Sequence, residues 1–135
     1  MVSVAYYTLV NINHINLAVQ DHELHWHSIH QVGNMAFDHN EILNTCLIRL
    51  QERIKAEPIG FNLLPEKFSM RSLQLLYESV LMVDLDRRNF RKKVMGTGLL
   101  IDMKELESDV PHRPAKLFKF NSEKYRQQDI KGNFV

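Results

Sequence analysis

Residues 85–95 have the sequence Leu-Asp-Arg-Arg-Asn-Phe-Arg-Lys-Lys-Val-Met, which predicts a short helix over 86–95. Asp86 is a favourable N-cap, because its side-chain oxygen can accept a hydrogen bond from a free N–H group of the first turn. Gly96 and Gly98 follow the helix and predict its end.

This helix has one narrow apolar stripe, formed by Phe90 and Val94 at 100° per residue. Arg88 and Lys92 point directly away from that stripe. The flanks and the first turn carry the other polar residues, which are Arg87, Asn89, Arg91 and Lys93. The pattern predicts a helix that is anchored by two side chains and that presents cations to an anionic partner. An ordinary solvated helix face is the alternative.

Length and composition indicate one domain, or one small domain with an additional piece. The chain has 135 residues, of which 44% are hydrophobic. Residues 1–60 hold three Lys/Arg against six Asp/Glu, a net charge of −3, whereas residues 61–135 hold fourteen against ten, a net charge of +4. We therefore expect the second half to face an anion.

The sequence contains neither an apolar run long enough to span a membrane nor a secretory signal, so we expect no membrane partner. Cys46 is the single cysteine, which excludes an internal disulfide. Reduced thiols are typical of the cytoplasm, and we expect a cytoplasmic location.

Three strands and one helix are predicted before Pro58. The strands are Val2–Val10, Ile15–Val19 and Asp21–His30. Asp38 and Glu41 have the spacing of a capping box at the start of the helix. The apolar residues of the helix recur every three or four positions, at Ile42, Leu43, Cys46, Leu47, Leu50 and Ile54. So small a set of elements buries little surface by itself, which suggests part of a larger fold or a partner that covers it.

The second half predicts a helix, a turn, the basic helix and a hairpin, in that order. Ile59–Pro65 is expected to be extended. Ser69 is the expected cap of a helix with apolar positions Leu73, Leu76, Tyr77, Val80 and Leu81. Strands are predicted at Leu99–Met103 and Pro114–Phe120, with a polar loop between them that we call the wing. This order is typical of a winged helix-turn-helix, whose second helix enters the DNA major groove.

Double-stranded DNA is therefore the expected partner. The candidate phosphate contacts are Arg87, Arg88, Arg91, Lys92, Lys93, Arg113 and Lys116. Neutralising phosphates releases counterions, so affinity should fall steeply with salt. Arg88 suits a guanine edge and Asn89 an adenine edge, and each such pairing contributes ~1–3 kcal/mol of discrimination.

Several separated motifs resemble the Nudix-related transcriptional regulators of the NrtR type. In the second half they are Leu63-Leu64-Pro65-Glu66-Lys67-Phe68-Ser69, Leu73-Gln74-Leu75-Leu76-Tyr77-Glu78, residues 85–93, Gly98-Leu99-Leu100 and Arg113-Pro114-Ala115-Lys116-Leu117-Phe118. Upstream they are Ser3-Val4-Ala5-Tyr6-Tyr7, Trp26 and Ala36-Phe37-Asp38-His39-Asn40-Glu41-Ile42-Leu43, which resemble the last part of a Nudix domain.

The resemblance implies an α+β fold in three parts. Residues 1–57 would be a partial Nudix-like segment of closing strands and a last helix, residues 58–121 the winged helix-turn-helix domain, and residues 122–135 a polar tail. It also implies a homodimeric repressor or activator of NAD or sugar-metabolism genes. An ADP-ribose or sugar-derivative effector would require a complete Nudix domain.

Catalysis is not expected, because the sequence contains no Gly-x5-Glu-x7-Arg-Glu-x2-Glu-Glu box. The carboxylates that would hold Mg²⁺ for pyrophosphate hydrolysis are therefore missing. The wing also departs from the family, since Asp109-Val110-Pro111-His112 replaces a Gly/Arg-rich turn before Arg113.

Four histidines, His22, His25, His27 and His30, lie within nine residues. Imidazoles at i and i+2 of a strand could converge on a metal. No cysteine or carboxylate cluster completes such a site, so we expect solvated or partner-facing histidines and neither metal nor cofactor.

Two further functions remain open at this point. The chain could be the C-terminal part of a Nudix hydrolase acting on a nucleoside diphosphate derivative, with the winged helix as an interaction module only. It could also be a split reading frame without a function of its own.

Overall fold

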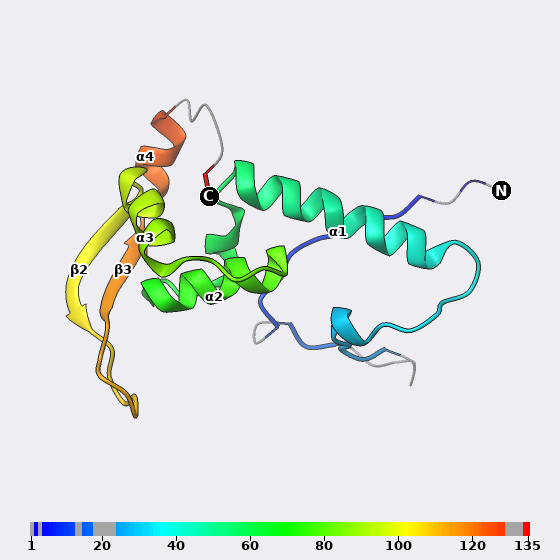
Figure 1. Cartoon of the computed structure of the whole chain (residues 1–135), viewed down its shortest axis with the longest axis horizontal. Helices are drawn as coiled ribbons and strands as arrows, with labels where there is room; N and C mark the ends of the chain where they lie inside the picture. Colours follow the sequence, from blue (N-terminus) through cyan, green and yellow to red (C-terminus); the bar gives the residue numbers. More distant parts are fainter. Residues whose placement is uncertain (1, 3, 13–14, 18–23, 129–133) are drawn as a thin grey trace.

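The structure is a computed structural model that describes residues 2, 4–12, 15–17, 24–128 and 134–135. Figure 1 shows the C-terminal part of α1 near α2, while the N-terminal half of α1 extends away from α2, α3 and the sheet. The helices are α1 (His39–Ala56), α2 (Met70–Leu81), α3 (Arg87–Gly96) and α4 (Ser122–Gln127). Within the described residues, the 3-10 helix η2 (Ile29–Gln31) precedes α1, and the 3-10 helix η3 (Ile59–Leu63) follows it. The strands are β1 (Phe68–Ser69), β2 (Leu100–Leu106) and β3 (Lys116–Phe120). None of the described helices is both long and apolar enough to cross a bilayer.

The helix pair α2–α3 forms as the sequence predicts. The Ser69 hydroxyl accepts from the Ser72 N–H at 3.1 Å and caps α2. The Asp86 carboxylate accepts from the Asn89 N–H at 2.8 Å and caps α3. Met82 ends α2 in the left-handed conformation, with φ 56°, so the chain turns directly into α3. Both caps satisfy backbone donors that the helices themselves leave free.

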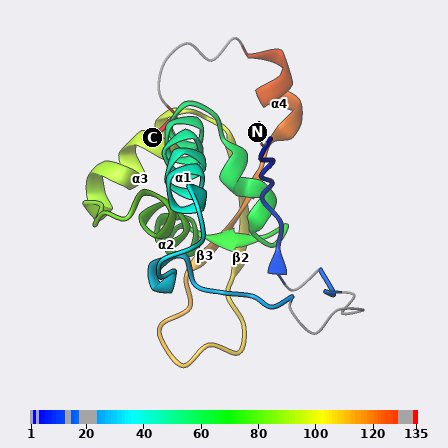
Figure 2. The same cartoon turned by 90° about the vertical axis from the view of Figure 1, so that its right-hand side faces the viewer.

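The three strands form one antiparallel sheet in the order β1-β3-β2. Phe118 of β3 is the register partner of Phe68 on one side and of Asp102 on the other. β2 extends to Leu106, three residues beyond the predicted strand, with an irregularity between Asp102 and Leu106. The wing projects away from the helices at the far end of this hairpin (Figure 2). The fold is therefore an α+β winged helix.

The hydrophobic core lies between α2, α3, η3 and the sheet. Its fully buried side chains are Tyr77, Phe118, Phe134, Ile54, Leu73, Leu99 and Val94. The ring of Phe61 stacks on Phe120 with centroids 4.2 Å apart. The buried hydroxyl of Tyr77 has no hydrogen-bond partner among the described residues, and burial raises the pKa of this phenol well above its usual range. Tyr77 is therefore retained in the core at some cost in desolvation.

The predicted strands of the first thirty residues are wrong wherever the structure describes them. Residues 4–10, 15–17 and 24–28 carry no strand, and the part of the third segment from Ile29 onward forms η2. Ala18, Val19 and 21–23 lie outside the described residues. A strand needs a hydrogen-bonded neighbour, and the described part of this chain supplies none to these segments.

The helix predicted after Asp38 is correct, but its capping box is wrong. Asp38 has φ −94° and ψ 15° and makes no side-chain cap hydrogen bond, because it does not adopt the extended conformation of an N-cap. Asn40 instead bonds the preceding turn, accepting from Met35 N at 2.7 Å and donating to Gly33 O at 2.9 Å. Only Ile54 of the apolar stripe is fully buried.

Two further segments differ from prediction. Residues 59–63, expected to be extended, form η3, which places Phe61 in the core. Residues 122–127, expected to be part of a polar tail, form α4 with Asn121 as its cap. Near the end of the chain, Phe134 is 1% exposed and packs on Phe61 and Tyr77. Its backbone N–H donates to Lys55 O, as does that of Val135.

We expect Phe134→Ala to lower the free energy of unfolding by about 3–5 kcal/mol, because it leaves a cavity between aromatic rings. Urea denaturation measures the loss. The matched control is Phe37→Ala, since Phe37 is 95% exposed and its truncation should change stability by no more than about 0.5 kcal/mol. Equal effects of the two substitutions would show that Phe134 does not complete the core.

Candidate nucleic-acid interface

Two buried side chains hold α3 on the protein. Phe90 is 4% exposed and Val94 0%, and the ring of Phe90 lies 5.7 Å from that of Tyr77 on α2. They are the only two fully buried residues of α3, so one stripe of the helix is fixed to the core. This is the anchoring predicted from the sequence.

The cations of α3 are exposed and have no acidic partner. All five are exposed, namely Arg87, Arg88, Arg91, Lys92 and Lys93. Within the described residues, no carboxylate lies within 4.0 Å of their charged groups. Arg88 and Lys92 lie opposite the buried stripe, so the outward surface of α3 is positive.

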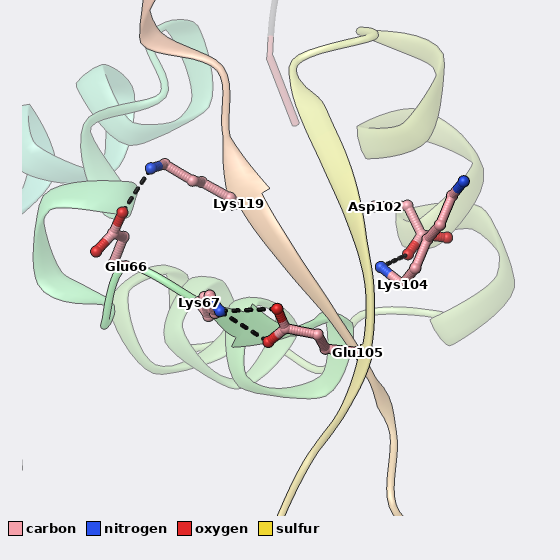
Figure 3. A network of polar contacts seen from close by, with 6 residues as sticks. All are labelled: Glu66, Lys67, Asp102, Lys104, Glu105 and Lys119. Carbon is pink, nitrogen blue, oxygen red and sulfur yellow. Dashed lines mark hydrogen bonds and ion pairs between the residues drawn. The ribbon is translucent and has the colours of Figure 1, made fainter.

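Two lysines beside the sheet, Lys67 and Lys119, are instead paired with carboxylates (Figure 3). Lys67 binds both carboxylate oxygens of Glu105, at 2.9 and 2.7 Å. Lys119 donates to Glu66, and this hydrogen bond and charge hold the pKa of the Glu66 carboxyl below its usual range. Lys67 and Lys119 therefore add less to the positive surface than the unpaired cations of α3.

Two of the predicted cations lie in the wing or in the adjoining strand β3. Arg113 is exposed and has no carboxylate within 4.0 Å in the described part of the chain. Lys116 lies 3.8 Å from Asp102, and its side chain is 65% exposed. Glu107 closes the loop by accepting from Ala115 N at 3.1 Å. The wing is thus less basic than α3.

A cleft of about 520 Å³ lies between α2, α3 and the wing. Arg87 and Arg91, one turn apart on α3, line it together with Arg113 and Lys116, so the structure brings four of the predicted residues together. Asn89 and Lys93, on the other flank of α3, do not line it. Arg71 of α2 also lines the cleft, and the sequence prediction missed it. Its signal was a basic residue in the first turn of a helix, where the macrodipole disfavours a cation.

The turn between α2 and α3 is fixed by Glu78 and Gln74. One carboxylate oxygen of Glu78 accepts from Leu85 N and from the Gln74 amide, both at 2.9 Å. The same Gln74 amide donates to Leu85 O at 2.9 Å. Both hydrogen bonds lower the pKa of the Glu78 carboxyl, and the bond from the Leu85 N–H has the larger effect.

The histidines show no metal site in the described residues, which contain no group of three or more potential ligands. His25, His27 and His30 are exposed. His27 Nε2 lies 3.1 Å from Gln31 O, and the rings of His25 and His27 are 6.1 Å apart. His22 lies outside the described residues.

Comparison with known families separates the winged helix from the rest of the chain. Residues 60–120 match the family described as the NrtR DNA-binding winged helix domain. Residues 60–120 are thus similar to the winged helix domain of NrtR proteins. The match begins within η3 and ends at the last residue of β3, so it includes α3, the cleft and the wing.

The likeness to NrtR proteins extends beyond this domain. The chain is 27% identical over 127 residues to the ADPR responsive transcriptional repressor NtrR of Acinetobacter baylyi, an alignment that covers 92% of this chain and 50% of the relative. It thus spans about half the length of that repressor.

Two solved NrtR structures are also similar. The crystal structure of Shewanella oneidensis NrtR complexed with a 27mer DNA has 25% identity and a TM-score of 0.58, covering 74% of this chain and 45% of that one. A structure of Shewanella oneidensis NrtR has 28% identity and a TM-score of 0.52, covering 64% and 39%.

Because the pKa of Glu78 is lowered in the folded state, its ionised form stabilises the fold above the carboxyl's ordinary pKa of about 4.5. That contribution is lost as pH falls through the depressed folded pKa. We expect Glu78→Gln to be less stable than the parent chain at pH 7, with the difference narrowing below pH about 4.

Urea unfolding of both chains across this pH range measures the effect. Glu52→Gln on α1 removes the same charge from an exposed site and serves as the control. If Glu78→Gln lowered the free energy of unfolding by the same amount from pH 7 to the acid limit, this account of the turn would be contradicted.

Proposed function

We propose that this chain is the DNA-binding portion of a transcription regulator of the NrtR type. The observation that carries the proposal is the unpaired positive surface of α3, fixed outward by Phe90 and Val94. An interaction module within a hydrolase would not require five uncompensated cations within seven residues on the second helix of a helix-turn-helix. The likeness to an NrtR structure complexed with DNA supports the same choice.

In the proposed complex, helix 86–95 lies in the major groove. Arg88, at the outward side of α3, would reach a guanine edge, and Asn89 on the adjoining flank would reach an adenine edge. The other candidates, Arg87, Arg91, Lys92, Lys93, Arg113 and Lys116, would neutralise phosphates and release counterions. Affinity then depends on salt, whereas base preference depends on the few groove-facing side chains.

The remaining parts of the proposal concern the rest of the chain. Residues 1–57 are assigned to the closing part of a Nudix-like domain and 58–121 to the winged helix, and α4 and Phe134 extend the latter. The match to the Acinetobacter repressor supports this assignment, because it covers far more than residues 60–120. The exposed apolar residues of the first segment, among them Val4, Tyr6 and Trp26, are consistent with a surface that other structure covers.

The proposed regulator acts in the cytoplasm as a homodimer, without catalysis, on genes of NAD or sugar metabolism. The relative is described as ADPR responsive, so ADP-ribose is the favoured effector, with a sugar derivative as the second choice. Effector binding is assigned only to a complete Nudix domain, since the chain lacks the carboxylate box that holds Mg²⁺. Whether the effector strengthens or weakens DNA binding sets the sign of regulation.

We expect the double substitution Arg88→Ala plus Lys92→Ala to weaken promoter binding about 100-fold, because two contacts of about 1.4 kcal/mol or more are lost. The slope of log K against log salt should become shallower by about 1–2, depending on how many of the two side chains neutralise a phosphate. Fluorescence anisotropy with labelled duplex at 50 and 200 mM salt measures both quantities.

The matched control is Arg49→Ala plus Lys55→Ala, which removes two exposed charges from α1. Its DNA affinity should stay within about twofold of that of the parent chain, because the lower net charge has only a small general effect. If the parent chain fails to bind duplex DNA at low salt, or if the α3 and α1 variants bind equally, the regulator is the wrong assignment. The hydrolase alternative would then be preferred.

A further inference from the structure

The cleft between α2, α3 and the wing collects basic side chains from three separate segments. Arg71 comes from α2, Arg87 and Arg91 come from α3, Arg113 comes from the wing and Lys116 from the first residue of β3. The lining is not purely polar, because Met70 and Phe118 contribute buried apolar surface. Cations beside apolar walls act on an anion more strongly than cations surrounded by water.

This cleft is strongly positive. The four arginines have no carboxylate within 4.0 Å in the described part of the chain. Glu78 is the one acidic residue that lines the cleft, and one of its carboxylate oxygens already accepts from Leu85 N and Gln74. The contact of Lys116 with Asp102 is long, at 3.8 Å. An anion entering the cleft would therefore meet uncompensated donors.

Arg71 is the member of the cluster that the fold explains least. It is the second residue of α2, whose cap is the neutral Ser69 and whose first turn contains no acidic residue. A cation at this end of a helix opposes the macrodipole and is unfavourable for the helix itself. It also makes no ion pair to a described residue that would offset this effect. A role toward a ligand accounts for its presence where stability does not.

We propose that this cleft holds one backbone phosphate of the bound DNA and that Arg71 is a ligand of that phosphate. The inference rests on the proposed function and extends the DNA-contacting surface from α3 and the wing to α2. Guanidinium groups suit the site, because their planar fork pairs two N–H donors with two phosphate oxygens. Such a contact fixes the register of α3 on the duplex and carries no sequence information of its own.

The test uses the full chain with Arg71→Gln, measured against promoter DNA and against an unrelated duplex. We expect about tenfold weaker binding to both duplexes and a salt slope shallower by about 0.9, as for one lost phosphate contact. The melting temperature should be unchanged or slightly higher, since the helix loses an unfavourable charge. Arg49→Gln on α1 is the matched control and should leave both DNA affinity and salt slope nearly unchanged.

Three outcomes would overturn the inference. If Arg71→Gln binds DNA with the affinity and salt slope of the parent chain, the phosphate contact is excluded. The proposed function would still stand in that case, because the parent chain binds DNA. Loss of affinity for the promoter alone would indicate base reading rather than phosphate binding.

The third outcome concerns free phosphate, the other source of the same chemical group. At constant ionic strength, inorganic phosphate should compete with DNA only weakly and equally in the parent chain and in Arg71→Gln. Saturable phosphate binding that Arg71→Gln abolishes without affecting DNA affinity would assign the cleft to a small anion. If the parent chain binds no duplex at any salt concentration, it is the proposed function that fails.

Discussion

The packing of Phe90 and Val94 against the core is the interaction on which the rest of the structure depends. These two side chains fix the rotation of α3 about its own axis, with Phe90 against Tyr77 of α2. Because the helix is held along one stripe only, its remaining positions are free to carry charge without disturbing the fold. The cost is five like charges within seven residues, which repel one another. Burial of two apolar side chains, each contributing about 1.5–3 kcal/mol, and the Asp86 cap offset that repulsion.

Local features of the sequence predicted the helix pair correctly, because caps and periodicity act within a few residues. Nonlocal features explain the failures. The segment 4–10 has the composition of a strand, but a strand forms only where another strand pairs with it. The Asp38 cap failed because Asp38 lies outside the extended region, directly after Phe37 with its left-handed φ of 54°. Phe134 lies in a segment without periodicity, and its burial comes from contacts with Phe61 and Tyr77, which are remote in sequence.

The residues of the candidate site also divide into those that local sequence predicts and those that depend on contacts remote in sequence. The outward face of α3 follows from 100° periodicity, so its cations could be named from the sequence. The sequence could not show which cations are paired, because Lys67 and Lys119 form ion pairs with Glu105 and Glu66, which are remote from them in sequence. Arg71 was missed for the converse reason: it joins the cluster only because folding places α2 beside the wing. The positive surface thus depends both on the unpaired cations of the helix and on the pairing of Lys67 and Lys119 elsewhere.

The central claim is that α3 presents free cations to DNA, while Lys67 and Lys119 beside the sheet are paired with carboxylates. Lysine modification read by mass spectrometry, with and without saturating duplex, tests it most directly. The account predicts that Lys92 reacts readily in the free chain and becomes protected on the duplex, while Lys67 and Lys119 react slowly and equally in both states. Unchanged reactivity of Lys92 in a saturated complex, with protection at Lys67 or Lys119 instead, would contradict it.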